Sequence, residues 1–415
     1  MVPSSTRTRL GRCARLLALA AAALAATAAT AAGPKAYIGN FKDSTVSVVD
    51  TASGAPVATI PVAAGPHGMA ISGDGRFVYV SGDGSSSMSV IDTASDKVVE
   101  TIEVGPTPHG IALVPDGKTV LVGVYGADRV AFVDVASRAV VGTVAVAKPH
   151  TIAVSPNGKL AYVASQQPGQ FALVVVDLAT RAVVRSIALD KPPRDPEVSH
   201  DGRFLYITTA GVNALRVIDV ASEKVVAEIA TGASPHIGKW FAGAGVGTIV
   251  VQGPGELLTF DPATQAPGRA FPVGRQPHWM ASDGKTVWVT NEGSNDVSAV
   301  DLASGKTTTI SVGNAPRKIV VQPAVAKGVA ASGSGAVSIA NFAFVPSPIT
   351  IPVGASVTWS NDDGAPHALA FADGAQASDL LLPGQRFTRS YAEAGTFDYV
   401  CSVHPYMTGK VTVRP

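Results

Sequence analysis

A unit of about 42 residues recurs seven times between residues 35 and 323, and this repeat constrains the fold more than any other feature. Its marker is an aspartate that ends a short alternating strand, with successive spacings of 42, 42, 43, 42, 42 and 40 residues. A period of about 40–45 residues with four strands per unit is typical of β-propeller blades. The marker residues are Asp50, Asp92, Asp134, Asp177, Asp219, Asp261 and Asp301.

The strands within one unit support this interpretation. The third unit has four candidate strands, at residues 110–114, 120–123, 129–133 and 139–144, and Asp-Gly or Asn-Gly turns recur between the first two strands of the units. The array begins with a second strand at residues 36–40 and ends with a lone first strand at residues 318–321. That last strand would complete the first blade and leave no free edge. We therefore predict a closed seven-bladed propeller over residues 35–323.

Composition agrees with an all-β chain and excludes several classes of protein. Of 415 residues only 15% are charged, while 42 are glycine and 29 proline. This balance argues against coiled coils and disorder and favours short strands with tight turns. A formal net charge of +1 gives no sign of a nucleic-acid partner. The only cysteines, Cys13 and Cys401, are too few for a disulfide scaffold or a four-cysteine metal site.

Residues 1–31 have the pattern of a secretory signal peptide. Four arginines precede an apolar run at residues 16–26, and Ala29-Thr30-Ala31 supplies a small-residue cleavage pattern. The run is short for a membrane span, although an uncleaved anchor is the alternative interpretation. No other stretch has 18 consecutive apolar residues, so we expect a periplasmic or secreted mature chain without a membrane span. That chain keeps one cysteine, Cys401, which cannot form an internal disulfide.

A histidine or arginine follows a proline just before each innermost strand of the propeller. These residues should form a ring at the mouth of the axial channel, because the strands that they introduce line the axis. Nearby, Asp195 and Glu197 could add oxygen ligands or neutralise an arginine. The ring consists of His67, His109, His150, Arg194, His236, His278 and Arg317.

Three interpretations of this ring are open. Duplication of a Pro-His-Gly turn could simply have copied imidazoles that pack and hydrogen-bond at the rim. Imidazole is also the commonest metal ligand, so the ring could hold copper or another metal. The two arginines would instead favour an anion or an organic ligand. The spacing does not choose between them, because every ligand would come from a different blade.

Beyond the propeller, residues 324–335 have the Ala, Gly and Ser composition of a flexible linker. Residues 336–415 then alternate in short apolar and polar runs, which predicts a small antiparallel β-sandwich. The expected strands cover residues 337–342, 356–360, 367–371, 386–391, 397–401 and 410–413.

The final turn of this domain carries a metal-ligand pattern. Cys401, His404 and Met407 are spaced as C-x2-H-x2-M, and His367 lies upstream. Two histidines and a cysteine with a weak thioether select copper and suit one-electron transfer. A rigid sandwich would hold these ligands in a geometry that both copper oxidation states tolerate.

Two family resemblances extend these predictions. The repeats, as in Val78-Tyr79-Val80-Ser81-Gly82, resemble the YVTN family of β-propellers. The C-terminal segments Gly395-Thr396-Phe397-Asp398-Tyr399-Val400-Cys401 and His404-Pro405-Tyr406-Met407 resemble the cupredoxins, most of all amicyanins, with pseudoazurins and plastocyanins close behind. The resemblance implies a Greek-key sandwich with a type 1 copper. The ligands that it implies are His367, Cys401, His404 and Met407.

One residue departs from the cupredoxin pattern. The residue after the first histidine is often asparagine in these families, where it braces the ligand loop, and here it is Ala368.

The order of the two domains resembles nitrous-oxide reductase, and two functions follow as hypotheses. The first is an exported copper protein that transfers electrons to a redox partner protein and serves a second metal or anion site in the propeller mouth, as in a copper-dependent oxidoreductase. The alternative is a ligand- or protein-binding propeller with a tethered electron carrier or copper-holding domain and no catalysis. The sequence identifies no catalytic residue, substrate or oligomeric state.

Overall fold

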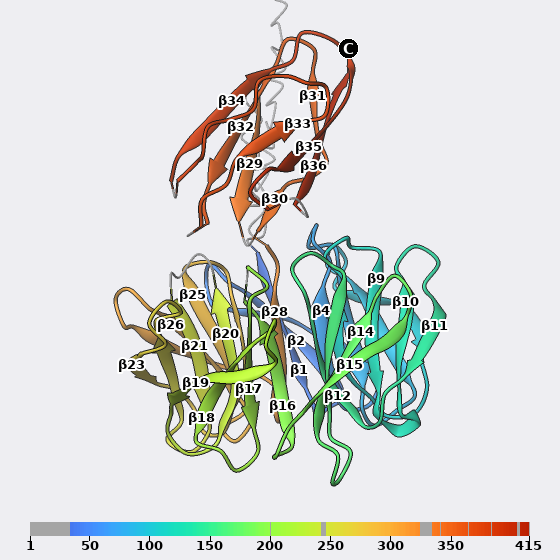
Figure 1. Ribbon diagram of the computed structural model, residues 1–415, viewed down its shortest axis with the longest axis vertical. Helices are drawn as coiled ribbons and strands as arrows, with labels where there is room; N and C mark the ends of the chain where they lie inside the picture. Colours follow the sequence, from blue (N-terminus) through green and yellow to red (C-terminus); the bar gives the residue numbers. More distant parts are fainter. Residues whose placement is uncertain are drawn as a thin grey trace, which may run out of the picture. The chain divides into compact units, whose positions relative to one another are not determined.

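The computed structural model describes residues 34–199, 201–241, 246–323, 334–340, 342–363, 365–382, 384–404 and 407–414. Over these ranges the regular secondary structure consists of β-strands and one short 3-10 helix, η1 (Tyr125–Ala127) (Figure 1). The predicted signal peptide and residues 324–333 of the predicted linker lie outside the described residues. In the described ranges, no helix is both long enough and apolar enough to cross a membrane.

Seven four-stranded antiparallel sheets form between residues 35 and 321, which confirms the predicted propeller. The innermost strands contact one another from blade to blade around the axis. They are β28 (Pro316–Val321), β4 (Pro66–Ile71), β8 (Pro108–Leu113), β12 (Pro149–Val154), β16 (Pro193–Val198), β20 (Pro235–Phe241) and β24 (Pro277–Ser282). The second strands are β1 (Lys35–Asn40), β5 (Phe77–Gly82), β9 (Thr119–Val124), β13 (Leu160–Ser165), β17 (Phe204–Thr209), β21 (Val246–Val251) and β25 (Thr286–Asn291).

The two outer positions of each blade follow in chain order. The third strands are β2 (Thr45–Asp50), β6 (Ser87–Asp92), β10 (Arg129–Asp134), β14 (Ala172–Asp177), β18 (Ala214–Asp219), β22 (Glu256–Phe260) and β26 (Asp296–Asp301). The outermost strands are β3 (Pro56–Pro61), β7 (Lys97–Glu103), β11 (Ala139–Ala145), β15 (Ala182–Ala188), β19 (Lys224–Ala230), β23 (Pro267–Pro272) and β27 (Thr307–Ser311).

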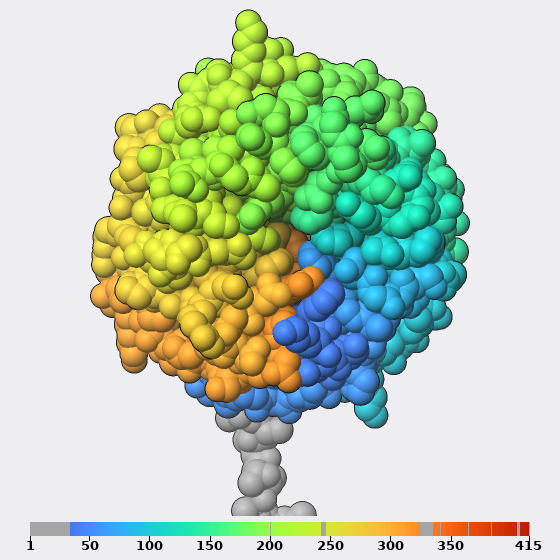
Figure 2. All heavy atoms as spheres, turned by 90° about the horizontal axis from the view of Figure 1, so that it is seen from below, coloured from blue at the N-terminus to red at the C-terminus, as the bar shows by residue number. Residues whose placement is uncertain are grey.

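Burial follows from the stacking of neighbouring blades. The second strands are buried on both faces, whereas the outermost strands are mostly exposed. The ring closes where β1 pairs with β28, with Ala36 opposite Val321. This is the closure that the phase of the repeat predicted, and it leaves the first blade without an open inner edge. Seen along the axis, the blades follow one another around a small central hollow (Figure 2).

The marker aspartates have a structural role. Asp134 Oδ1 accepts hydrogen bonds from the backbone N–H and the hydroxyl of Ser137, at 2.7 Å each. These bonds hold the turn that leads to the outermost strand, and the backbone bond is the main cause that lowers the pKa of Asp134. Asp177 and Asp219 make the same pair of bonds to Thr180 and Ser222. The feature that revealed the repeat therefore shapes the turns of the blades.

The C-terminal domain is a sandwich of two four-stranded sheets, in the orders β30-β29-β32-β34 and β31-β36-β35-β33. The sequence predicted six of these strands but missed β30 and β31, and it predicted a linker where β29 already begins. The strands are β29 (Ser334–Ala340), β30 (Ala343–Val345), β31 (Ile349–Pro352), β32 (Ser356–Asn361), β33 (Leu369–Phe371), β34 (Arg386–Ser390), β35 (Gly395–Cys401) and β36 (Thr408–Arg414).

The sandwich is not purely antiparallel, contrary to the prediction. Strands β29 and β32 pair in parallel, and so do β31 and β36. The chain between each of these partners crosses to the other sheet, so it can return in the same direction. Alternation along the strands fills the space between the sheets with Val357 and Trp359 from β32 and with Tyr399 and Cys401 from β35. Cys401 is thus the last inward-facing residue of its strand.

Candidate metal centre

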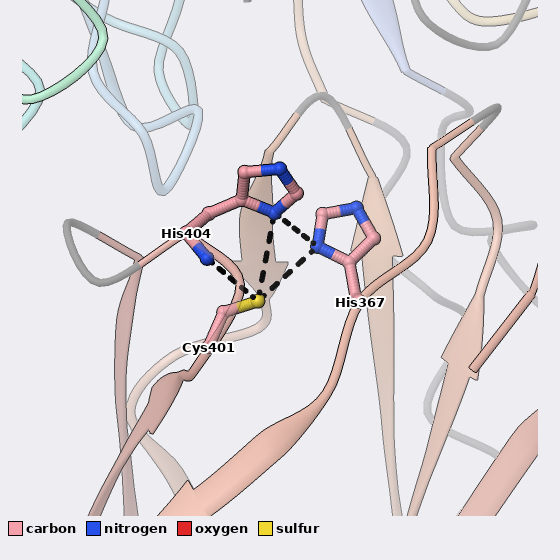
Figure 3. A group of neighbouring side chains, drawn as sticks. All are labelled: His367, Cys401 and His404. Carbon is pink, nitrogen blue, oxygen red and sulfur yellow. Dashed lines mark hydrogen bonds between the residues drawn. The ribbon is translucent and has the colours of Figure 1, made fainter. Parts of the chain in front are cut away.

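Three predicted ligands converge at one end of the sandwich. The Sγ atom of Cys401 lies 3.5 Å from His367 Nδ1 and 3.6 Å from His404 Nδ1, and the two Nδ1 atoms are 3.2 Å apart (Figure 3). Among the described residues, this is the one group of three or more His, Cys, Asp or Glu side chains placed closely enough to share a metal ion. Both imidazoles present the same ring nitrogen to the sulfur.

Backbone hydrogen bonds determine where the ligands of the last turn lie. Cys401 N donates to Met407 O at 3.0 Å, and Met407 N donates to His404 O at 2.9 Å, so the loop after β35 closes on itself. His404 N also donates to the cysteine sulfur at 3.4 Å. The short C-x2-H-x2-M spacing is therefore the length of a tight loop, and this loop brings the His404 side chain to the cysteine.

Met407, the fourth predicted ligand, is buried. It packs in the same hydrophobic core as Cys401 and is 3% exposed. Its thioether is the weak, soft donor that the predicted copper site requires. Its role as a ligand stays a prediction.

His367 is held from a second segment of the chain. It pairs with Leu381 through two backbone hydrogen bonds, with N–O distances of 3.0 and 2.6 Å. Asn361, which is fully buried, donates to Leu381 O and to Ala365 O at 2.8 Å each, so it ties both sides of this loop together. Ala368 stands where related proteins often have an asparagine that braces the ligand loop. Its backbone O accepts a hydrogen bond from Ser402 N at 2.8 Å, so the backbone links the two loops.

A buried carboxylate, which sequence reasoning missed, lies behind His367. The Oδ2 atom of Asp363 is 2.9 Å from His367 Nε2, and both side chains are almost completely buried. A carboxylate on the far nitrogen of a metal-binding imidazole fixes its orientation and makes it a stronger donor. The signal in the sequence was the pair Asp362-Asp363 four to five residues before the histidine, in a domain with few buried charges.

The pKa values of the donor groups reflect this environment. Burial lowers the pKa of His367, but hydrogen bonds to Asp363 and Cys401 outweigh burial and raise it to about 9. Burial raises the pKa of the Cys401 thiol, but hydrogen bonds from His367 and from backbone N–H groups outweigh burial and lower it. The thiolate is the form that binds metal, so the site favours the required state of its sulfur. A soft thiolate, two imidazoles and a buried thioether fit copper.

The two histidines differ in their access to solvent. His367 is fully buried, whereas His404 is only partly buried, and the edge of Phe342 packs against both rings. Val403, Leu380 and Leu382 are 44–51% exposed and flank the residues that hold the site. The group therefore has one imidazole in the interior and one at an apolar surface.

The propeller ring lies at the first turn of the innermost strands, where the sequence placed it. His67 stacks on His109 with ring centroids 3.7 Å apart, His109 on His150 at 4.2 Å, and His236 on His278 at 4.1 Å. The Nδ1 atoms of His109, His150 and His278 each lie 2.9–3.1 Å from the backbone carbonyl of the next ring residue. A neutral imidazole must donate through Nδ1 to make this bond, which leaves the lone pair on Nε2.

Burial is the main cause that lowers the pKa of all five ring histidines, that of His150 to about 4. Both arginines already have protein partners. Arg194 donates to Gln252 Oε1 and Pro235 O, and Arg317 pairs with Glu292 at 3.0 Å. Of the two neighbouring acids, Glu197 pairs with Lys239 rather than with an arginine.

Comparisons with known proteins agree with these two folds. Residues 38–240 match the family of the cytochrome D1 heme domain, and residues 331–414 match the copper binding proteins of the plastocyanin/azurin family. Hydrazine synthase of Kuenenia stuttgartiensis is similar in structure, with a TM-score of 0.57 and 21% identity over 66% of this chain and 92% of that one. The dihydro-heme d1 dehydrogenase NirN has a TM-score of 0.51 and 18% identity, over 69% of this chain and 74% of that one. These two likenesses concern the fold alone.

The relatives of the C-terminal domain are nearer in sequence. Amicyanin-alpha of Methylorubrum extorquens is 35% identical over 90 residues, which cover 20% of this chain and 76% of the relative. Chloroplastic plastocyanin of Tetradesmus obliquus is 32% identical over 141 residues, which cover 28% of this chain and 94% of the relative. The C-terminal domain is a cupredoxin, and its cofactor is a type 1 copper. Through this domain the chain belongs to the plastocyanin/azurin family of copper-binding proteins.

Proposed function

We propose that this protein is an exported electron carrier with one mononuclear copper per chain. The observation that carries the proposal is the convergence of two imidazole Nδ1 atoms and a thiol sulfur at the end of a buried sandwich. Copper bound there would supply a Cu(II)/Cu(I) couple. The proposed ligands are His367, Cys401, His404 and Met407.

The residues around the donors support a rigid site. Asp363 holds the His367 ring, and the loop bonds between Cys401, His404 and Met407 limit movement of the other donors. Little rearrangement would then accompany a change of one electron, which favours fast transfer over chemistry on a bound substrate.

Electrons would enter and leave through His404, because His367 is enclosed by the protein. His404 is partly buried, and the exposed side chains of Val403, Leu380 and Leu382 flank the ligand segments. Apolar side chains around one accessible ligand suit brief docking of a redox partner protein without strong charge pairing.

For the propeller, the ring geometry favours the binding module over a second metal centre. The ring imidazoles stack on one another, and three Nδ1 atoms are already bonded to carbonyl groups. The axial cavity of ≈ 430 Å³, in contrast, is large enough for a small ligand. A metal or anion held by the ring is the competing proposal.

Copper reconstitution tests both halves of the proposal. Wild-type protein given Cu(II) should develop an intense thiolate-to-copper absorption band at one copper per chain, and Cys401→Ser should lose both band and copper. The matched control, the double variant His109→Gln and His236→Gln, should keep one copper and the full band. A colourless wild-type protein would refute the copper site. A second copper that disappears only in the double variant would establish the metal-binding ring instead.

Export is tested by the mature N-terminus. Expression of the full chain in a bacterium, followed by fractionation, should give a periplasmic or secreted protein that begins near residue 32. A protein that retains residues 1–31 in the membrane fraction would indicate the uncleaved anchor.

A further inference from the structure

The axial channel of the propeller contains a second polar site that the copper proposal does not use. Its cavity of ≈ 430 Å³ is lined by residues of the innermost strands, and the lining begins one to three positions after the ring residues. The channel lies on the axis that Figure 2 views end-on. Apolar side chains such as Met69, Ile111 and Ile319 form about half of the wall. Four charged residues interrupt it: Asp195, Glu197, Lys239 and Lys318.

Two of these charges neutralise each other. Lys239 Nζ, from β20, lies 2.8 Å from Glu197 Oε2 of the adjacent strand β16. Burial lowers the pKa of Lys239, but the nearby carboxylates of Glu197 and Asp195 outweigh burial and raise it. This pair is complete and needs no ligand.

No salt bridge or hydrogen bond joins the other two charged residues, Asp195 and Lys318, which affect each other only at longer range. Burial is the main cause that raises the pKa of Asp195 and lowers that of Lys318. Asp195 is 4% exposed, and its Oδ2 atom is buried without a hydrogen-bond partner. Lys318 is also 4% exposed, and its Nζ atom lies over the Trp279 ring. Within the described residues, no ion pair joins Lys318 to Asp195 or to another carboxylate. Both groups line the same cavity.

Holding an acid and a base charged in a buried cavity without a direct bond is costly, because each charge loses its hydration without full compensation. Native proteins rarely leave such groups unsatisfied unless a ligand or an ordered water completes them. A simple anion would neutralise Lys318 and worsen the position of Asp195. A simple cation would do the reverse. A molecule that carries both charges satisfies both side chains at once.

We propose that the axial channel binds a small zwitterionic solute, with the carboxylate of the solute on Lys318 and its ammonium group on Asp195. The cavity volume restricts the ligand to a small molecule, and the apolar wall and Trp279 would contact the carbon chain between its charged ends. The innermost strands β28 and β16, which belong to different blades, supply the two charged contacts. The site therefore exists only in the closed propeller.

Binding is measured by calorimetry and thermal shift on the full, copper-loaded chain. The probes are glycine, β-alanine and γ-aminobutyrate, which differ in the distance between their charges, with acetate and methylammonium as singly charged controls. At least one zwitterion should bind saturably and raise the melting temperature of the propeller, and neither control ion should do so. Absence of saturable binding for all three zwitterions would overturn the proposal. Equal binding of acetate or methylammonium would also overturn it.

Variants locate the site. Asp195→Asn and Lys318→Met should each weaken binding by about 30-fold or more, because each leaves one charge of the ligand unpaired. Lys285→Met, which removes a lysine whose side chain is 84% exposed, should leave binding unchanged. Circular dichroism and the copper band report whether each variant is folded. Folded variants that keep wild-type affinity would refute the assignment, while the copper site would be unaffected by either outcome.

Discussion

Replacement of Asp363 by asparagine tests how the protein sets the potential of its copper. The carboxylate Oδ2 lies 2.9 Å from His367 Nε2 and also accepts a hydrogen bond from Phe342 N at 2.9 Å. Asparagine has nearly the same shape, and its amide oxygen can accept both bonds. Asp363→Asn therefore removes a buried negative charge while it leaves the ligand loop in place.

The magnitude follows from the separation of the charges. A copper ion on Nδ1 would lie about 7 Å from the carboxylate, across the width of the imidazole ring. At an effective dielectric constant near 20, one unit of charge at that distance corresponds to roughly 2.4 kcal/mol. This is equivalent to about 100 mV for one electron. The negative charge stabilises Cu(II) more than Cu(I), so its removal should raise the reduction potential by about this amount.

Spectroelectrochemical titration of the copper band measures this potential directly. The control is Asp398→Asn, which removes a carboxylate of the same domain whose side chain is 60% exposed and paired only with a surface lysine. Screening by water should keep its effect several-fold smaller. An Asp363→Asn protein with an intact copper band and an unchanged or lower potential would refute the electrostatic account of this residue.

Two further predictions concern the propeller. Gly247→Ala should lower the free energy of unfolding by roughly 1–3 kcal/mol in a urea titration, because the added Cβ would overlap the buried ring of Phe260 on the paired strand. Gly73→Ala is the control, since its Cβ would meet open space, and it should leave the free energy of unfolding unchanged. Burial raises the pKa of Asp195 to about 6, so the folded state holds its proton more tightly than the unfolded state does. Without added ligand, the free energy of unfolding should then fall by roughly 3 kcal/mol as the pH rises from about 4 to about 6. Asp195→Asn should abolish this pH dependence. If the variant had the same pH profile as the wild type, Asp195 would not be its source. The charged groups around Asp195 are Lys318, Lys239 and Glu197.

Much of the architecture could be predicted from the sequence because its determinants are local. Each marker aspartate holds a turn within three residues of itself, and the alternation of side chains has a period of two along every strand. Seven copies of such a unit predict a closed ring, because the array begins with a second strand and ends with the first strand that completes the same blade. The strands that were missed, β30 and β31, are three and four residues long and have too few alternating positions to give a pattern.

The same distinction applies to the two sites. Three of the four proposed copper ligands lie within seven residues, so their spacing was visible in the sequence. The fourth, His367, reaches the cysteine only because the sandwich folds its segment next to β35. The pair Asp362-Asp363 was the only hint of the carboxylate behind His367, and its role could not be predicted, because it depends on the path of a loop that the sequence does not specify.

By itself, the sequence determined the number of blades and the sandwich and predicted the copper donors, since turns, alternation and a short loop are properties of neighbouring residues. Only the tertiary structure decided which charges meet. Asp195 and Lys318 line the same cavity, although their strands, β16 and β28, are more than a hundred residues apart in the sequence. Both strands lie around the same axis only because the last strand pairs with the first and closes the ring.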